Sequence, residues 1–184
     1  IDLKGTLIHT RDFMWRMGVN LTHYKNVVTD LPLKDMPVTG VTRLKEGRSV
    51  YDFYLREWAG VDPDNGDPLW YKNVKDEQGN ITGRTTTNDY AQADYYYVDK
   101  SSLPKVYGGF NTAFSYKGFE LSAIFAYSIG GYIVDRDVTM LWSNGSNPGR
   151  AWSTEILKRW TPENRYTDVP ALKTVSNNWN SNST

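Results

Sequence analysis

The sequence predicts an all-β fold built from long antiparallel strands and long loops. Apolar and polar residues alternate with a period of two across residues 103–134, which is the periodicity of a strand and not of a helix. Aromatic residues make up 14% of the 184 residues, and Asn, Asp, Gly, Ser and Thr crowd the segments between the alternating runs. This composition favours β-structure joined by loops.

Residues 103–134 predict a β-hairpin that reverses at Lys117-Gly118, where the Gly supplies the positive φ of a tight turn. Each arm has roughly a dozen residues, about twice the usual soluble strand of ~5–6 and enough for a tilted membrane-spanning strand of ~9–11. The apolar face of the second arm comprises Phe119, Leu121, Ala123, Phe125, Tyr127, Ile129 and Ile133. The opposite face comprises Glu120, Ser122, Ala126, Ser128 and Gly130, with Ile124 and Tyr132 as exceptions.

Two structures fit this hairpin equally well. In an outer-membrane barrel, lipid contacts the apolar face and the lumen contacts the other. In a soluble β-sandwich or β-helix, the apolar face packs on a protein core instead. Tyr116 and Phe119 flank the turn, where an aromatic girdle of a membrane interface would lie, but soluble hairpin ends carry exposed aromatics too.

An earlier pair of strands repeats the pattern. Residues 1–8 alternate, with Ile1, Leu3 and Leu7 on one face, and the residues 9–12 predict a turn. Residues 13–22 alternate more clearly and place Arg16 on their polar face. A charge facing hydrocarbon at mid-depth costs ~2–4 kcal/mol, so in a barrel Arg16 must face the lumen.

The middle of the chain predicts loops and shorter strands. Residues 25–47 have loop composition, and residues 49–59, 69–74 and 95–98 predict strands. A polar turn at 76–80 and a Thr-rich run separate the last two. How many of these strands belong to a barrel wall is left open by the pattern.

The chain after Val134 is predicted to be irregular except for one short helix. Ser153 can cap it, Glu155 lies in its first turn, Lys158 and Arg159 lie in its last turn, and Pro162 ends it. Ile156 and Trp160 lie four residues apart on one side, so Trp160 is predicted to pack in a small core of the loop.

The turn-rich residues 61–68 offer a weak calcium candidate in Asp62, Asp64 and Asp67. The acid that completes an EF-hand loop is missing, because the twelfth position from Asp62 is Asn73. An ordinary Asx-rich turn is the favoured interpretation, and no metal site is expected.

Composition excludes several classes of function. With 21 basic and 21 acidic side chains, nothing indicates binding to nucleic acid. The absence of Cys excludes thiolate zinc sites and cysteine nucleophiles. His9 and His23 have no partner at the spacing of a triad or a metal site, so we expect neither an enzyme nor a cofactor.

Two linked motifs carry a family resemblance. The stretches LPKVYGGFNTAFSYKGFELSAIFAYSIGG and ILKRWTPENRYTDVP closely resemble the C-terminal part of SusC/RagA-type TonB-dependent outer-membrane transporters of the Bacteroidetes. Residues 12–28 and 47–71 are similar to the family as well. The matching positions are Pro104, Lys105, Gly108, Gly109, Tyr116, Lys117, Gly118, Phe119, Arg159, Trp160, Thr161, Glu163, Asn164, Thr167 and Pro170.

The resemblance implies that residues 1–184 are part of one TonB-dependent receptor β-barrel domain, a sector of a transmembrane barrel of about 22 strands. We expect a fragment that lacks the plug, the TonB box, an N-terminal extension and the closing strands. The resemblance further implies active import of a glycan or peptide in the cell outer membrane. The implied partners are a SusD-like surface lipoprotein, TonB acting through the absent plug, and outer-membrane lipid.

Short barrel turns face the periplasm and long loops face outward, so Lys117-Gly118 would be periplasmic and residues 25–47 and 135–184 extracellular. The loop residues Trp142, Trp152 and Trp179 are candidates for contact with substrate or with the lipoprotein lid, or else they stabilise the loop itself. The alternatives are a secreted β-sandwich that binds carbohydrate through exposed aromatics, and a purely structural sector.

Overall fold

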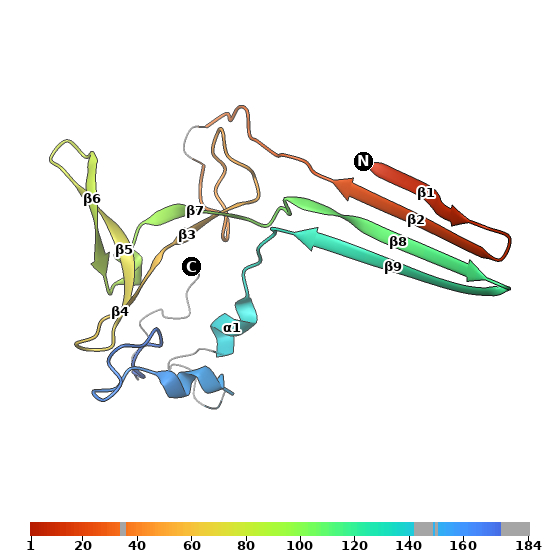
Figure 1. Ribbon diagram of the computed structural model, residues 1–184. Coiled ribbons are helices and arrows are strands. Elements are labelled where there is room, and N and C mark those ends of the chain that lie inside the picture. The colour runs from red at the N-terminus through yellow and green to blue at the C-terminus, as the bar shows by residue number, and fades with distance from the viewer. Residues whose placement is uncertain (34–35, 142–148, 150, 174–184) are drawn as a thin grey trace. The chain divides into compact units, whose positions relative to one another are not determined.

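The computed structural model describes residues 1–33, 36–141, 149 and 151–173, which fall into two compact units (Figure 1). The first, called here the sheet unit, comprises residues 1–36, 44–52 and 100–133. The second, called here the loop module, comprises residues 37–43, 53–99 and the described residues that follow 133. Each unit is described by itself.

The sheet unit contains a four-stranded antiparallel sheet in the order β1-β2-β8-β9. Its strands are β1 (Asp2–His9), β2 (Phe13–Thr22), β8 (Val106–Tyr116) and β9 (Phe119–Ile129). The predicted hairpin is therefore confirmed as β8 and β9. Its two turn residues, Lys117 and Gly118, have φ values of 46° and 90°, and positive φ at both positions is the backbone of a type I′ turn.

The register places both short turns at one end of the sheet. Phe13 pairs with Tyr116, which pairs with Phe119 on the next strand. At the other end, Thr22 pairs with Tyr107. Because β2 and β8 are direct neighbours, the connection 23–105 leaves and re-enters the sheet between adjacent strands, so it is one long loop and its short strands do not belong to this sheet.

Strand β1 corrects one prediction. The pairing with β2 shifts between Thr6 and Ile8, so Ile8 and not Leu7 lies opposite Trp15. A bulge inserts one residue and exchanges the faces beyond it, which ends the alternation that would have placed Leu7 with Ile1 and Leu3.

The loop module contains a separate antiparallel sheet in the order β4-β5-β6, and β3 pairs with β7. The single strand predicted at 49–59 is two strands interrupted at Glu57. The prediction that the Thr-rich run is a polar separator between strands is also wrong, because its threonines belong to β6. Thr is β-branched and is common in strands. The strands are β3 (Asp52–Arg56), β4 (Trp58–Val61), β5 (Pro68–Lys75), β6 (Ile81–Thr87) and β7 (Tyr95–Ser101).

The helices are short. The predicted helix is a 3-10 helix, in which the Ser153 Oγ accepts a hydrogen bond from the Glu155 N–H at 3.3 Å, and Trp160 lies beyond its end. Residues 136–141 form an α-helix instead of the predicted irregular chain, and the Asp135 carboxylate caps it. The helical segments are η1 (Tyr90–Gln92), α1 (Arg136–Leu141) and η2 (Thr154–Lys158). Within the described parts of the chain, none is long and apolar enough to cross a membrane.

The loop module has a core of its own around Trp70, whose side chain is fully buried. The indole ring meets Trp58 and Tyr90 edge-on, with centroid distances of 5.7 and 5.1 Å. The Arg56 guanidinium lies 4.0 Å from the Tyr90 ring centroid, so a cation covers the edge of this aromatic cluster. Long loops that build such a core hold a defined shape.

Candidate functional site

The four-stranded sheet presents one continuous apolar face. Cross-strand rows of large side chains run over it, such as Val19, Phe110 and Phe125, and the Phe110 and Phe125 rings stack with centroids 5.8 Å apart. The one polar group of the Trp15 indole is satisfied on this face, because its N–H donates to the Thr112 hydroxyl at 2.9 Å. The rows make the face apolar along the full length of the strands.

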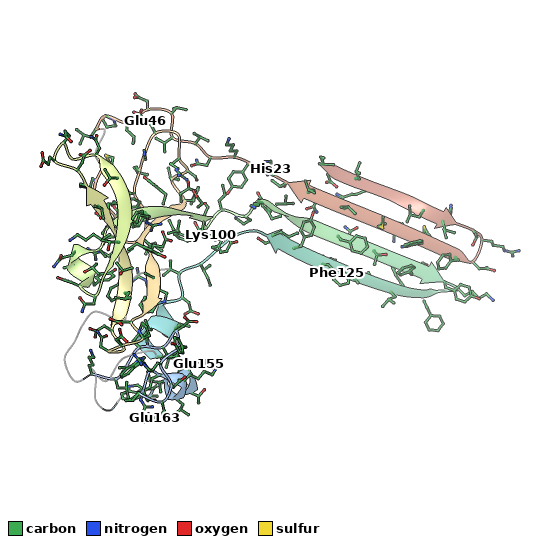
Figure 2. The ribbon with its side chains drawn as sticks, turned by 60° about the vertical axis from the view of Figure 1, so that its left-hand side comes forward. His23, Glu46, Lys100, Phe125, Glu155 and Glu163 are labelled. Atoms are coloured by element: carbon green, nitrogen blue, oxygen red, sulfur yellow. The ribbon has the colours of Figure 1, made fainter. Side chains whose placement is uncertain are left out.

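Nothing in the described part of the chain covers this apolar face. Leu121 is 69% exposed and Phe125, labelled in Figure 2, is 56% exposed. Burial of each such side chain away from water is favourable by ~1.5–3 kcal/mol of free energy. A soluble sandwich would bury both residues against a second sheet, and the described residues supply no such sheet.

The opposite face is polar and carries an ion pair. The Arg16 guanidinium reaches the Glu120 carboxylate at 3.3 Å, crossing the small side chain of Ala113 on the intervening strand. Arg16 therefore lies on the face where the barrel interpretation requires it. Both side chains remain more than half exposed, so the pair itself stabilises the sheet by less than ~1 kcal/mol.

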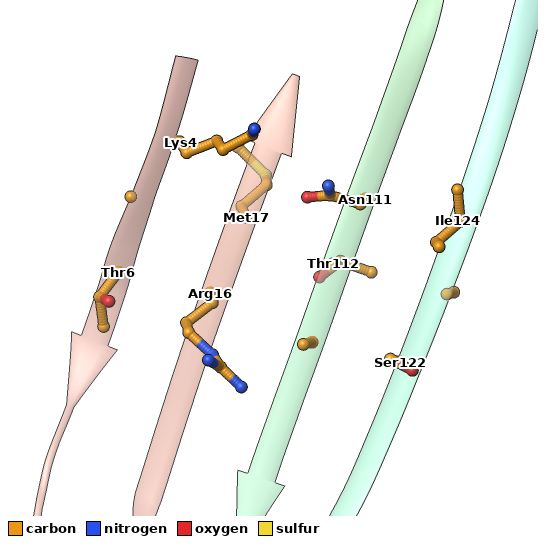
Figure 3. A pocket seen from close by; sticks show the side chains of 11 residues that line it. Lys4, Thr6, Arg16, Met17, Asn111, Thr112, Ser122 and Ile124 are labelled. Carbon is orange, nitrogen blue, oxygen red and sulfur yellow. The ribbon is translucent and has the colours of Figure 1, made fainter. Parts of the chain in front are cut away.

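A shallow hollow of about 470 Å³ lies beside Arg16 on this polar face (Figure 3). Lys4, Thr6, Asn111 and Ser122 contribute polar side chains to its lining, and Met17 and Ile124 contribute large apolar side chains. The Asn111 amide fills the space above Gly18, where an added Cβ would lie 2.4 Å from the Asn111 Oδ1. The lining is suited to polar contacts with a molecule or segment inside a lumen. Sequence reasoning placed Arg16 and Ser122 on the polar face but did not predict a hollow between them.

Two of the three predicted tryptophans, Trp142 and Trp179, lie outside the described residues. Trp152 is described and is 38% exposed. Trp160 is half-buried, and its indole N–H donates to the Pro63 carbonyl at 3.1 Å, a contact that fits the predicted core role and not a substrate-facing one. Trp152 is therefore the most exposed tryptophan among the described residues.

The three aspartates of the turn 62–68 are engaged by other groups. The Asp62 carboxylate accepts hydrogen bonds from the Asp64 N–H at 2.9 Å and the Asn65 amide at 2.9 Å, which is an Asx-turn arrangement. Asp64 pairs with Arg165, and Asp67 pairs with Lys173. No group of three or more His, Cys, Asp or Glu is placed to hold a metal ion within the described residues.

These contacts lower the pKa of the Asp67 carboxyl. Partial burial opposes its ionisation, but hydrogen bonds from Lys173 and Asn88 outweigh that effect and lower the pKa of Asp67. On the neighbouring hairpin, hydrogen bonds from Asn80 lower the pKa of Asp76. Both carboxylates are therefore held ionised as structural anchors of their turns.

Comparison with known proteins gives a consistent picture. No family model matches the chain. Over 92% of its length, the chain is 27% identical to "TonB-dependent receptor P3" and to "TonB-dependent receptor P26" of Formosa agariphila, and it spans 18% of the length of each.

Solved structures match more closely in sequence. "Structure of the RagAB peptide transporter" superposes with a TM-score of 0.80 at 31% identity, covering 93% of this chain and 19% of that one. The RagAB peptide importer in its "closed-closed" state gives a TM-score of 0.79 at 30% identity, covering 96% of this chain and 20% of that one. The two-faced sheet, the motifs and these matches agree. The chain therefore corresponds to a barrel segment of the TonB-dependent receptors of the SusC/RagA type, which are β-barrel proteins of the outer membrane.

Proposed function

We propose that this chain supplies wall strands and outer loops to a transporter that imports nutrients across the outer membrane. The observation that carries the proposal is the sheet with a bare apolar face and a polar face that holds Arg16 and Glu120. Lipid would cover the first face, and the second would line the lumen. Residues 1–184 would then belong to a single barrel domain, with the loop module as part of its outer loops.

The orientation follows from the connections. The short turns after β1 and β8 would face the periplasm, and the loop 23–105 and the chain after β9 would face outward. Import would depend on TonB acting through a plug elsewhere in the receptor, and on a SusD-like surface lipoprotein over the outer mouth. The matched structures are those of a peptide transporter or importer, so peptides are the first cargo to test and glycans the second.

We infer no catalytic role for this segment. The matched proteins carry the names of receptors and transporters. The His23 ring nitrogen Nδ1 lies 2.6 Å from the Lys105 carbonyl oxygen, a contact that orients a strand end. Asp64 and Asp67 already bind Arg165 and Lys173, so we propose no calcium site in this turn.

The test uses the full-length receptor expressed with its partner lipoprotein in outer membranes. Uptake of fluorescently labelled oligopeptides and of labelled oligosaccharides is measured with and without the receptor, and with an uncoupler that removes the energy of the inner membrane. We expect one cargo class to accumulate only with the receptor present and the inner membrane energised. Accumulation that depends neither on the receptor nor on an energised inner membrane would contradict the proposed import.

A second measurement concerns the tryptophans. We propose that Trp152, with Trp142 and Trp179, contacts the cargo or the lipoprotein. Replacing Trp152 with Ala should lower uptake or lipoprotein co-purification, because the ring is 38% exposed and offers a flat apolar surface. The matched control is Leu157→Ala in the same loop module, at an apolar side chain that has no ring and is 74% exposed. If both variants behave like the parent, this sector has a structural role only.

A further inference from the structure

Two segments that lie about a hundred residues apart in the sequence meet within the loop module. They are the turn 62–68 and the segment 159–173, and their contacts span separations of 97 to 106 residues. The turn belongs to the connection between β2 and β8, whereas the segment follows β9. We call their contact the joint.

The turn has a shape of its own before the segment meets it. The Asp62 N–H donates to the Asp67 carbonyl and the Gly66 N–H donates to the Asp62 carbonyl, both at 2.8 Å. Gly66 has a φ of 74°, a left-handed conformation that favours glycine. The turn therefore offers preformed backbone carbonyls, those of Pro63 and Gly66, to an approaching segment.

Close packing holds the segment against this turn. A Cβ added to Gly66 would lie 2.6 Å from the Ala171 Cβ and 2.7 Å from the Trp160 ring, so only glycine admits the segment at this distance. The Ala171 N–H donates to the Gly66 carbonyl at 3.0 Å, and the Trp160 indole donates to the Pro63 carbonyl at 3.1 Å. Val169 and Ala171 are buried.

Two cations of the segment close the contact. The Arg165 Nε–H donates to the Pro63 carbonyl at 2.7 Å, and its guanidinium also binds the Asp64 carboxylate. Lys173 binds the Asp67 carboxylate. Exposed ion pairs are weak by themselves, but here they add to buried apolar contact and backbone hydrogen bonds at the same place.

The segment is braced internally by residues of the second family motif. The Lys158 carbonyl accepts hydrogen bonds from the Asn164 amide at 2.9 Å and from the Thr167 hydroxyl at 2.6 Å. The Trp160 N–H donates to the Val169 carbonyl at 2.8 Å. These bonds fold the segment back on itself and present Trp160 and Ala171 to Gly66 together.

We propose that the joint is permanent and makes the β2–β8 loop and the chain after β9 move as one body during transport. The inference rests on the proposed import function. The matched RagAB importer has been solved in "closed-closed" and "open-open" states, and a permanent joint would be intact in both. The alternative is a latch that must open in each transport cycle.

The first test measures hydrogen exchange by mass spectrometry on the full-length receptor. Arg165→Ala should raise the exchange rate in the peptide that contains residues 62–68 by about threefold to tenfold, because the turn loses a brace supplied from the other loop. Tyr166→Ala is the matched control and should leave this peptide unchanged, since Tyr166 is 92% exposed. Unchanged exchange in Arg165→Ala would overturn the joint as a stabilising contact.

The second test asks whether the joint opens. Asp64 and Arg165 are replaced together by Cys in a cysteine-free receptor and bridged by a bifunctional thiol reagent that dithiothreitol releases. Uptake of a labelled peptide mixture by the bridged receptor should equal or exceed uptake by the unbridged variant. A block that reduction relieves would overturn permanence. If the parent receptor takes up nothing, the import proposal fails by itself, and the exchange measurement still decides on the joint.

Discussion

The Tyr127 hydroxyl donates a hydrogen bond to the Asn20 carbonyl at 2.8 Å, across the glycine of the strand that lies between them. That glycine, Gly108, has no side chain, and a Cβ there would lie 2.1 Å from the Asn20 oxygen and 2.7 Å from the Tyr127 hydroxyl. One phenol therefore links β9 to β2 over β8. The arrangement gives a physical reason for a glycine in the first family motif.

Removing this link should weaken the loop end of the sheet. Tyr127→Phe keeps the ring and loses one hydrogen bond, so we expect a loss of about 0.5–1.5 kcal/mol in the free energy of unfolding. Gly108→Ala inserts a methyl group where two atoms already lie, and we expect a larger loss of about 1–3 kcal/mol. Urea unfolding of the full-length receptor in lipid vesicles measures both.

The control for these variants is Gly83→Ala, at a glycine with no heavy atom within 4 Å of an added Cβ. It should change stability little. The proposed link would be wrong if Gly108→Ala matched this control.

The two faces of β9 make a sharper prediction, because adjacent apolar residues point to opposite sides. Phe125 pairs with Phe110 on the apolar face, whereas Ile124 pairs with Asn111 on the polar face. Phe125→Arg should cost ~2–4 kcal/mol if that face meets hydrocarbon near mid-depth, and Ile124→Arg should be tolerated. The folded fraction of full-length receptor in outer membranes, measured by its heat-dependent gel mobility, separates the two. Equal losses would contradict the assignment of faces.

The sequence alone predicts the two faces of most of the four-stranded sheet, because successive side chains of a strand point to alternate faces. This is why Arg16 and Glu120 could be placed on one face before their strands were paired. Counting fails at β1, where a bulge near Leu7 adds a residue that no local pattern announces. The pairing of β2 with β8 was also beyond local pattern, since 83 residues lie between Thr22 and Val106.

In the loop module, prediction from the sequence failed for a different reason. The spacing of Asp64 and Asp67 offered a weak calcium candidate beside the favoured Asx-rich turn, but it gave no sign that their partners are Arg165 and Lys173, far along the chain. Distant cations leave no mark on local spacing. Trp160 was predicted to pack in a small core through its distance from Ile156 on a helix, but the helix ends before it, and the ring is half-buried against Gly66.

The lowered pKa of Asp67 predicts a dependence on pH. A carboxyl whose pKa is lower folded than unfolded contributes stability above its unfolded value, and that contribution is lost as the pH falls through the folded value. The unfolded value is about 3.9, so exchange protection of residues 62–68 should fall as the pH drops below about 4.

Asp67→Asn provides the comparison at neutral pH. It should cost about 1 kcal/mol there and should remove this part of the acid sensitivity, because Lys173 loses its charged partner. If the variant and the parent lose protection along the same acid profile, Asp67 is not the group responsible.

The two residues of the turn between β8 and β9 both have positive φ but differ in residue type, and two substitutions can test the effect of this difference. Lys117 has a φ of 46° and Gly118 a φ of 90°, and only the second is a glycine. Asn tolerates the left-handed conformation better than Lys, so Lys117→Asn should stabilise the hairpin by about 0.5 kcal/mol. Gly118→Ala should destabilise it by about 1 kcal/mol or more, although the space there is open, because the penalty lies in the backbone. Refolding of the full-length receptor from urea into vesicles measures both changes in stability. Stabilisation by the first substitution and destabilisation by the second would attribute the effect to backbone conformation and not to lost side-chain contacts.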